Sequence, residues 1–98
     1  MVKRIIIWDI EAGKNRKAIL KYWRDRTKSV TYSKKLNLLF SNSVKRLIDF
    51  PFSGKKFDES EIRYIFVKDY LIFYKFSDSQ IIILKIWDGN QDQENLEF

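Results

Sequence analysis

The sequence predicts an α+β domain in which a small, curved antiparallel β-sheet carries an α-helical hairpin on one face. Two observations support this prediction. Residues 62–87 contain three apolar runs, rich in Ile, Phe and Tyr, with short polar breaks between them, which is typical of strands joined by tight turns. Residues 11–49 place apolar side chains at helical spacing, with one interruption. We therefore expect the order β-α-α-β-β-β in a single domain, residues 1–87, followed by an acidic tail, residues 88–98.

The first strand is expected at Val2–Trp8, where the apolar residues occupy both faces. Asp9 follows it, and a carboxylate at this place can accept hydrogen bonds from the free N–H groups of a first helical turn. The first helix is expected at Glu11–Arg26, with Ile19 and Trp23 on its apolar side.

The second helix is expected at Val30–Asp49, with Ser29 as its N-cap and Pro51 ending it because proline has no N–H to donate. The break between the two helices is so short that they must fold back as an antiparallel hairpin. The segment Pro51–Glu61 is then expected to be the one long loop, because it combines proline, glycine, serine and charged residues.

The three-stranded meander at Ile62–Trp87 is apolar on both faces. Tyr64 and Phe66 share one face of its first strand, and Ile65 and Val67 share the other. An antiparallel sheet with one face in water alternates apolar with polar residues, so each face here needs a cover. The helical hairpin supplies one cover, and we expect nothing in the chain to supply the second. The uncovered face is therefore predicted to be an interface.

The composition excludes several kinds of chemistry. The chain has no cysteine and no histidine, which excludes disulfides, zinc sites of the Cys/His type, and catalysis by imidazole or thiolate. We expect no metal and no cofactor. The N-terminal apolar run is too short for a signal peptide or a membrane span, and the absence of cysteine fits a reducing cytoplasm, so a cytoplasmic location is expected.

Charge is divided unevenly along the chain. All 19 basic residues lie in residues 1–87 together with nine of the 13 acidic ones, which gives this body a net charge of +10. The remaining four acidic residues lie in residues 88–98, so the tail carries −4. A body this basic attracts polyanions or an acidic protein partner.

The ordered set of residues resembles the RelE/ParE family of bacterial toxins from type II toxin–antitoxin modules, a family that includes plasmid stabilisation proteins. The matching residues are Trp8, Ala12, Ile19, Tyr22, Trp23, Tyr32, Ser33, Leu36, Phe40, Leu47, Phe50, Pro51, Gly54, Arg63, Tyr70, Ile72, Phe73, Tyr74, Ile83, Leu84, Lys85, Ile86, Trp87, Asp88 and Gln91. They span nearly the whole chain.

The resemblance implies growth inhibition by a toxin that a cognate antitoxin protein neutralises. An extended or helical acidic segment of the antitoxin would fill the uncovered face and form a hetero-oligomer with the toxin. The residues expected to bind it are Ile65, Val67, Ile83 and Trp87.

RelE-type toxins cut mRNA on the ribosome, which requires cations around the reacting phosphate, a proton acceptor and a proton donor. Arg63 matches the sheet arginine of the family and is the candidate catalytic residue; its structural alternative is a salt bridge with Glu59, Glu61 or the acidic tail. The residues expected to bind nucleic acid or another target are Lys55, Lys56, Arg63, Lys85, Asn90 and Gln91.

The end of the last strand departs from the mRNA-cleaving pattern. The chain has no histidine, no tyrosine follows Tyr74, and neutral Asn90 stands where relatives carry arginine. This favours a ParE-like toxin, which inhibits DNA gyrase by binding it. The alternatives are a RelE-like ribosome-dependent mRNA endonuclease and an inactive relic that only binds antitoxin, so whether the chain is an enzyme stays open. A further alternative is a nucleic-acid-binding module whose aromatic residues stack on bases, although aromatic residues on apolar faces more often belong to the core. The residues in question are Trp8, Tyr22, Trp23, Tyr32 and Trp87.

Overall fold

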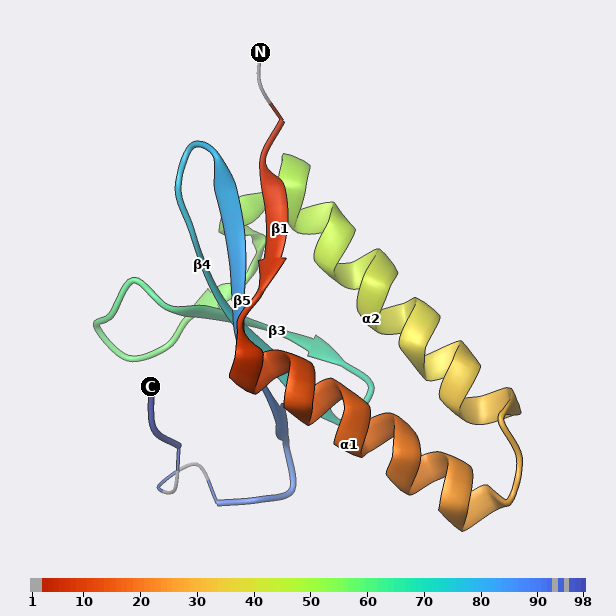
Figure 1. Ribbon diagram of the computed structural model, residues 1–98. Coiled ribbons are helices and arrows are strands. Elements are labelled where there is room, and N and C mark those ends of the chain that lie inside the picture. Colours follow the sequence, from red (N-terminus) through yellow and green to blue (C-terminus); the bar gives the residue numbers. More distant parts are fainter. Residues whose placement is uncertain (1–2, 93, 95) are drawn as a thin grey trace.

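The computed structural model describes residues 3–92, 94 and 96–98 and confirms the α+β class, with two antiparallel helices packed on one face of a sheet (Figure 1). The elements in chain order are β1 (Ile5–Trp8), α1 (Ile10–Thr27), α2 (Thr31–Asp49), a 3₁₀ turn η1 (Pro51–Ser53), β2 (Lys55–Lys56), β3 (Arg63–Val67), β4 (Tyr70–Phe76) and β5 (Gln80–Asp88). Both predicted helices and all three meander strands are confirmed.

The sheet has five strands in the order β1-β5-β4-β3-β2. It is mixed rather than wholly antiparallel, because β1 runs parallel to β5, with Ile6 opposite Ile81. A parallel pair needs a long connection, and the helical hairpin and the rest of the meander provide one. The short strand β2 lies where a loop was expected; its two residues pair with the start of β3, Lys55 with Tyr64 and Lys56 with Arg63.

The helix starts differ in detail from the prediction. Asp9 stands at the N-cap position of α1, but its side chain makes no capping hydrogen bond. Its backbone carbonyl accepts from the N–H of Gly13 at 2.9 Å instead. Ser29 lies one residue before the N-cap of α2, and its hydroxyl accepts from the N–H of Thr31 at 3.2 Å. Within the described residues, neither helix is long and apolar enough to cross a membrane.

Arg16 joins the two helices to each other and to β1. Its guanidinium donates to the Oδ1 of Asn37 at 2.8 Å and to the hydroxyl of Ser41 at 2.7 Å, both on α2. The same group lies 4.5 Å from the ring centroid of Trp8. These contacts fix the helical hairpin over the sheet.

The core lies between α2 and the central strands. Its fully buried residues come from one stripe of α2 and from the helix-facing side of the sheet, as the helical spacing predicted. The largest of these residues are Leu36, Phe40, Val44, Leu47, Ile72, Tyr74, Ile81 and Ile83.

The structure corrects the predicted face of three residues. Val67 and Ile83 are buried in the core beneath the helices, and half-buried Ile65 packs against it, so none of them lies on the uncovered face. A β-bulge between β4 and β5 contributes to this outcome: Phe73 pairs with Lys85 while Tyr74 pairs with Ile83, which shifts the alternation of faces along β5.

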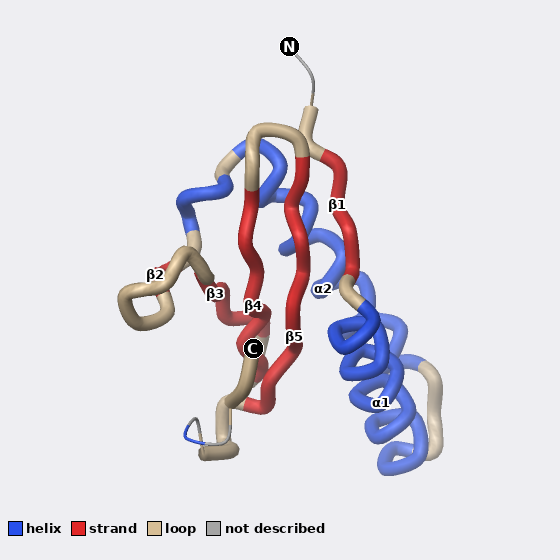
Figure 2. The backbone as a smooth tube through the Cα atoms, turned by 60° about the vertical axis from the view of Figure 1, so that its left-hand side comes forward, coloured by secondary structure: helices blue, strands red, loops and turns tan. Residues whose placement is uncertain are grey.

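The face away from the helices is partly covered by the chain itself, which corrects a second expectation. Phe73 is fully buried on this face, and the rings of Phe57 and Phe98 pack against it. Figure 2 shows the C-terminal end in front of β4, on the side away from the helices. A loop residue and the tail therefore supply part of the cover that was assigned to a partner.

Candidate functional site

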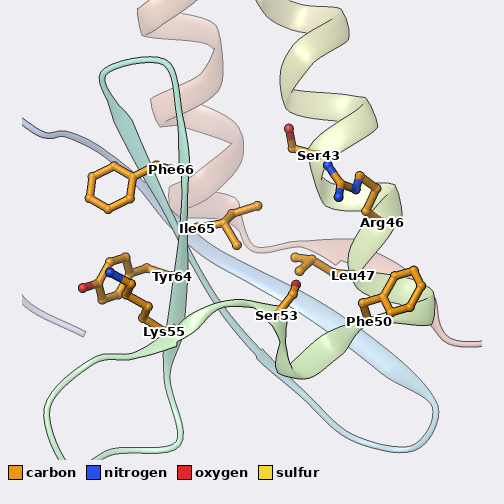
Figure 3. A pocket seen from close by; sticks show the side chains of 9 residues that line it. All are labelled: Ser43, Arg46, Leu47, Phe50, Ser53, Lys55, Tyr64, Ile65 and Phe66. Atoms are coloured by element: carbon orange, nitrogen blue, oxygen red, sulfur yellow. The ribbon is translucent and has the colours of Figure 1, made fainter.

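A groove lies between the second half of α2 and the strand β3 (Figure 3). Its volume is about 520 Å³. Ile65 points from β3 toward the helix, whereas Tyr64 and Phe66 point away to the other side of the strand (Figure 3). The lining residues are Ser43, Arg46, Leu47, Phe50, Ser53, Lys55, Tyr64, Ile65 and Phe66. We call this surface the α2/β3 groove.

The end of α2 shapes one wall of the groove. The N–H of Phe50 donates to the carbonyl of Arg46 at 3.0 Å, so the two residues stand one helical turn apart. Pro51 then turns the chain, which leaves the ring of Phe50 65% exposed at the rim. Arg46 and Lys55 are exposed as well, and buried Leu47 lies deeper. The groove thus combines cations with apolar surface, which suits an acidic and partly apolar partner.

Tyr74 anchors the turn after α2, which forms another side of the groove. This side chain is fully buried, and its hydroxyl donates to the carbonyl of Pro51 at 2.7 Å and accepts from the N–H of Gly54 at 3.0 Å. One phenol thereby satisfies two backbone groups that the turn after α2 would otherwise leave buried and unpaired. The segment 51–54 is held in place by this contact.

Arg63 completes the same anchor from the start of β3. Its Nη1 donates to the carbonyl of Gly54 at 2.7 Å and to that of Phe52 at 3.4 Å, and its guanidinium lies 5.0 Å from the ring centroid of Phe52. Arg63 thus contacts backbone carbonyls and a ring, rather than the carboxylates of Glu59 or Glu61. These contacts of Arg63 stabilise the segment 51–54.

The remaining residues predicted to bind a target do not come together. Lys55 lines the α2/β3 groove, but Lys56 lines a different hollow on the face away from the helices. Lys85 donates to the backbone carbonyl of Glu97 at 2.7 Å.

Trp87, Asn90 and Gln91 line a separate hollow of about 620 Å³ against α1, beside Tyr22 and Trp23. The sequence-predicted site is therefore spread over three surfaces. Which of these surfaces binds a partner remains a prediction.

Sequence reasoning missed Arg46 and Phe50 as groove residues. A signal was present for Phe50, which immediately precedes the proline that ends α2, where the backbone leaves the helix. Arg46 was not distinguishable from the other exposed cations of α2, because only the position of β3 makes it a groove residue. In the described part of the chain, no group of three or more acidic side chains could hold a metal ion.

The buried tyrosines predict an alkaline limit to stability. Burial raises the pKa of Tyr70 and of Tyr74 above the usual tyrosine value. The folded state then keeps protons that the unfolded chain loses near pH 10. The free energy of unfolding should keep its full tyrosine contribution below about pH 10 and fall as the pH rises toward the folded pKa. Urea denaturation at several pH values from 8 to 11 measures this slope.

The control for this prediction is exposed Tyr22. Tyr74→Phe should flatten the slope above pH 10 relative to the wild-type chain, while Tyr22→Phe should leave it unchanged. All groups other than the substituted tyrosine are common to the wild-type chain and each variant, so their contribution cancels in the comparison. An equal slope in all three would contradict the assignment to Tyr74.

The comparisons with known proteins agree with this fold. A family model described as "ParE toxin of type II toxin-antitoxin system, parDE" matches residues 6–93. Among solved structures, one titled "Chromosomal ParDE TA system from P. aeruginosa" is similar, with a TM-score of 0.75 and 16% sequence identity over 88% of this chain and 96% of that chain. At this identity the likeness shows the fold. No curated protein sequence matches the chain.

Proposed function

Because the chain belongs to the ParE toxin family of type II toxin–antitoxin systems, we propose that it inhibits DNA gyrase by binding it and that a cognate antitoxin neutralises it. It acts in the cytoplasm, where gyrase is found. The α2/β3 groove is the surface that contacts the target. The antitoxin forms a hetero-oligomer with the toxin through an acidic segment suited to the +10 body.

One observation carries the choice of binding over mRNA cleavage: the two side chains best suited to phosphate chemistry are engaged in the loop anchor. Arg63 donates to the carbonyls of Phe52 and Gly54. Tyr74, the last tyrosine of the chain, is fully buried with its hydroxyl donating to Pro51. A general acid must reach the leaving oxygen, and a phenol committed to a buried carbonyl does not.

The test uses two target assays side by side. We expect the purified chain to inhibit supercoiling by purified gyrase at stoichiometric concentrations and to leave mRNA intact on translating ribosomes. Cuts within codons on ribosomes, with gyrase indifferent to a large excess of the chain, would overturn the proposal. Coexpression with an antitoxin encoded beside the toxin should restore both growth and supercoiling, and failure to do so would contradict neutralisation.

Arg63 provides a prediction that separates the two mechanisms. Arg63→Ala removes a charged donor to two carbonyls and should lower the free energy of unfolding by about 1.5 kcal/mol. Gyrase inhibition per mole of folded protein should change less than threefold. If inhibition or toxicity is abolished while circular dichroism shows a folded chain, Arg63 acts on the target directly and its supporting role is not the main one.

A further inference from the structure

On the face of the sheet away from the helices, Phe98 packs against two other aromatic rings. The ring of Phe98 lies edge-on to two others, 5.0 Å from the centroid of Phe73 and 5.4 Å from that of Phe57. Phe57 and Phe73 are themselves 5.2 Å apart. Edge-to-face contacts at these distances are favourable, so the three rings form one cluster. We call Phe57, Phe73 and neighbouring Lys85 the aromatic pocket.

Because Lys85 is a cation, the aromatic pocket favours an occupant that offers carbonyl or acidic groups. Its Nζ donates to the backbone carbonyl of Glu97 at 2.7 Å and lies 5.5 Å from the ring centroid of Phe98. A single cation thus holds both the backbone and the ring of the occupant. The bulge between β4 and β5 is what places Lys85 opposite Phe73, on the same face of the sheet.

The occupant is only partly buried. Phe98 remains 55% exposed although it touches two rings, and residues 88–98 carry four acidic side chains against the +10 body. The tail is bound through an aromatic ring and a neighbouring backbone carbonyl in an acidic segment. Another peptide with these features can make the same contacts. The tail is tethered, so its advantage over such a peptide is its effective concentration rather than better contacts.

We propose that the aromatic pocket is a docking site for an acidic, phenylalanine-bearing segment of a partner protein, that residues 96–98 are its resident occupant, and that the partner binds by displacing them. Charge favours an acidic heterologous partner over a second copy, because two whole chains each carry a net charge of +6 and repel each other. This inference depends on the proposed function in one respect only, which is that the partner is the antitoxin.

The test asks whether a separate peptide with the tail's sequence binds the aromatic pocket once the ring of Phe98 is removed from the chain. A synthetic peptide of residues 92–98 is titrated into the isotope-labelled full chain, and NMR amide shifts of Phe57, Phe73 and Lys85 report binding. Phe98→Ala in the full chain should bind the peptide about tenfold more tightly than the wild-type chain, because the tethered competitor is gone. The matched control, Leu38→Ala, changes a residue that is 62% exposed on α2 and should behave as the wild type.

Two further arms define the chemistry. A peptide with alanine in place of its phenylalanine should not shift these amides, and adding Lys85→Gln to the Phe98→Ala chain should weaken binding of the original peptide at least threefold. Equal affinity for the wild-type and Phe98→Ala chains, or no binding to either, would overturn the proposal, as would a concentration-dependent wild-type dimer that buries the pocket. The same NMR spectra show whether each variant is folded. None of these measurements involves gyrase. If the chain does not inhibit gyrase, the NMR result on the aromatic pocket is therefore unaffected.

Discussion

Replacing Gly54 with alanine should destabilise the chain by about 3 kcal/mol, because the new methyl group has no space and the anchor must open to admit it. A Cβ built at this position clashes with the Tyr74 hydroxyl and lies 2.9 Å from the carbonyl oxygen of Tyr64. Gly54 has a φ of −74°, which any residue adopts, so the requirement for glycine is close approach rather than backbone conformation. Thermal unfolding followed by circular dichroism should show a Tm lower by roughly 15 °C.

The chain provides a matched control for this substitution. A Cβ added at Gly13 meets nothing within 4 Å, and the residue lies within α1. Gly13→Ala should therefore stabilise the chain by about 0.5 to 1 kcal/mol through helix propensity.

A double-mutant cycle then locates the clash. Removing the hydroxyl with Tyr74→Phe should reduce the cost of Gly54→Ala, since the oxygen is the nearest atom to the new methyl group. Additive effects of the two substitutions would contradict the geometry of the anchor.

The sequence positions of the three meander strands were predictable because their apolar runs and polar breaks are local signals. Their faces were not. Tyr64 and Phe66 are as apolar as Ile65 and Val67, so hydrophobic alternation gives no preference for which pair faces the helices. The structure chooses Ile65 and Val67, and the bulge near Phe73 places Ile83 with them. A strand that is apolar on both faces needs tertiary contacts to settle its orientation.

The candidate site was less predictable than the fold for a related reason. A single exposed phenylalanine or cation has the same appearance in the sequence whether it lines a groove or faces water. Phe50 and Arg46 become groove residues only because β3 stands opposite them, and Phe98 reaches the aromatic pocket only because the tail turns back to β4. Both contacts join segments that are far apart in the sequence, so local sequence patterns cannot predict them.

Charge reversal at Arg46 is the substitution that should most weaken target binding if the α2/β3 groove contacts gyrase. Arg46 is exposed beside Phe50 and Ile65, so it supplies the cation next to the apolar floor of the groove. An arginine in such a place is a frequent energetic centre of an interface, and Arg46→Glu should cost about 2 kcal/mol of binding, which corresponds to roughly thirtyfold in the concentration that inhibits supercoiling. The hydrogen bond from Phe50 uses the backbone carbonyl of residue 46 and survives the change.

Lys45 supplies the control that makes this prediction specific. It is exposed, it precedes Arg46 on α2, and it does not line the groove. Lys45→Glu changes the net charge and the field at the end of the helix by nearly the same amount, so long-range attraction and the helix dipole are matched between the two variants. Its inhibition of gyrase should fall less than threefold. If both variants lose inhibition equally, the positive body attracts gyrase without a defined contact, and the groove is not the target surface. If neither loses it, binding uses another surface, of which the hollow beside α1 that holds Trp87 and Asn90 is the next to test.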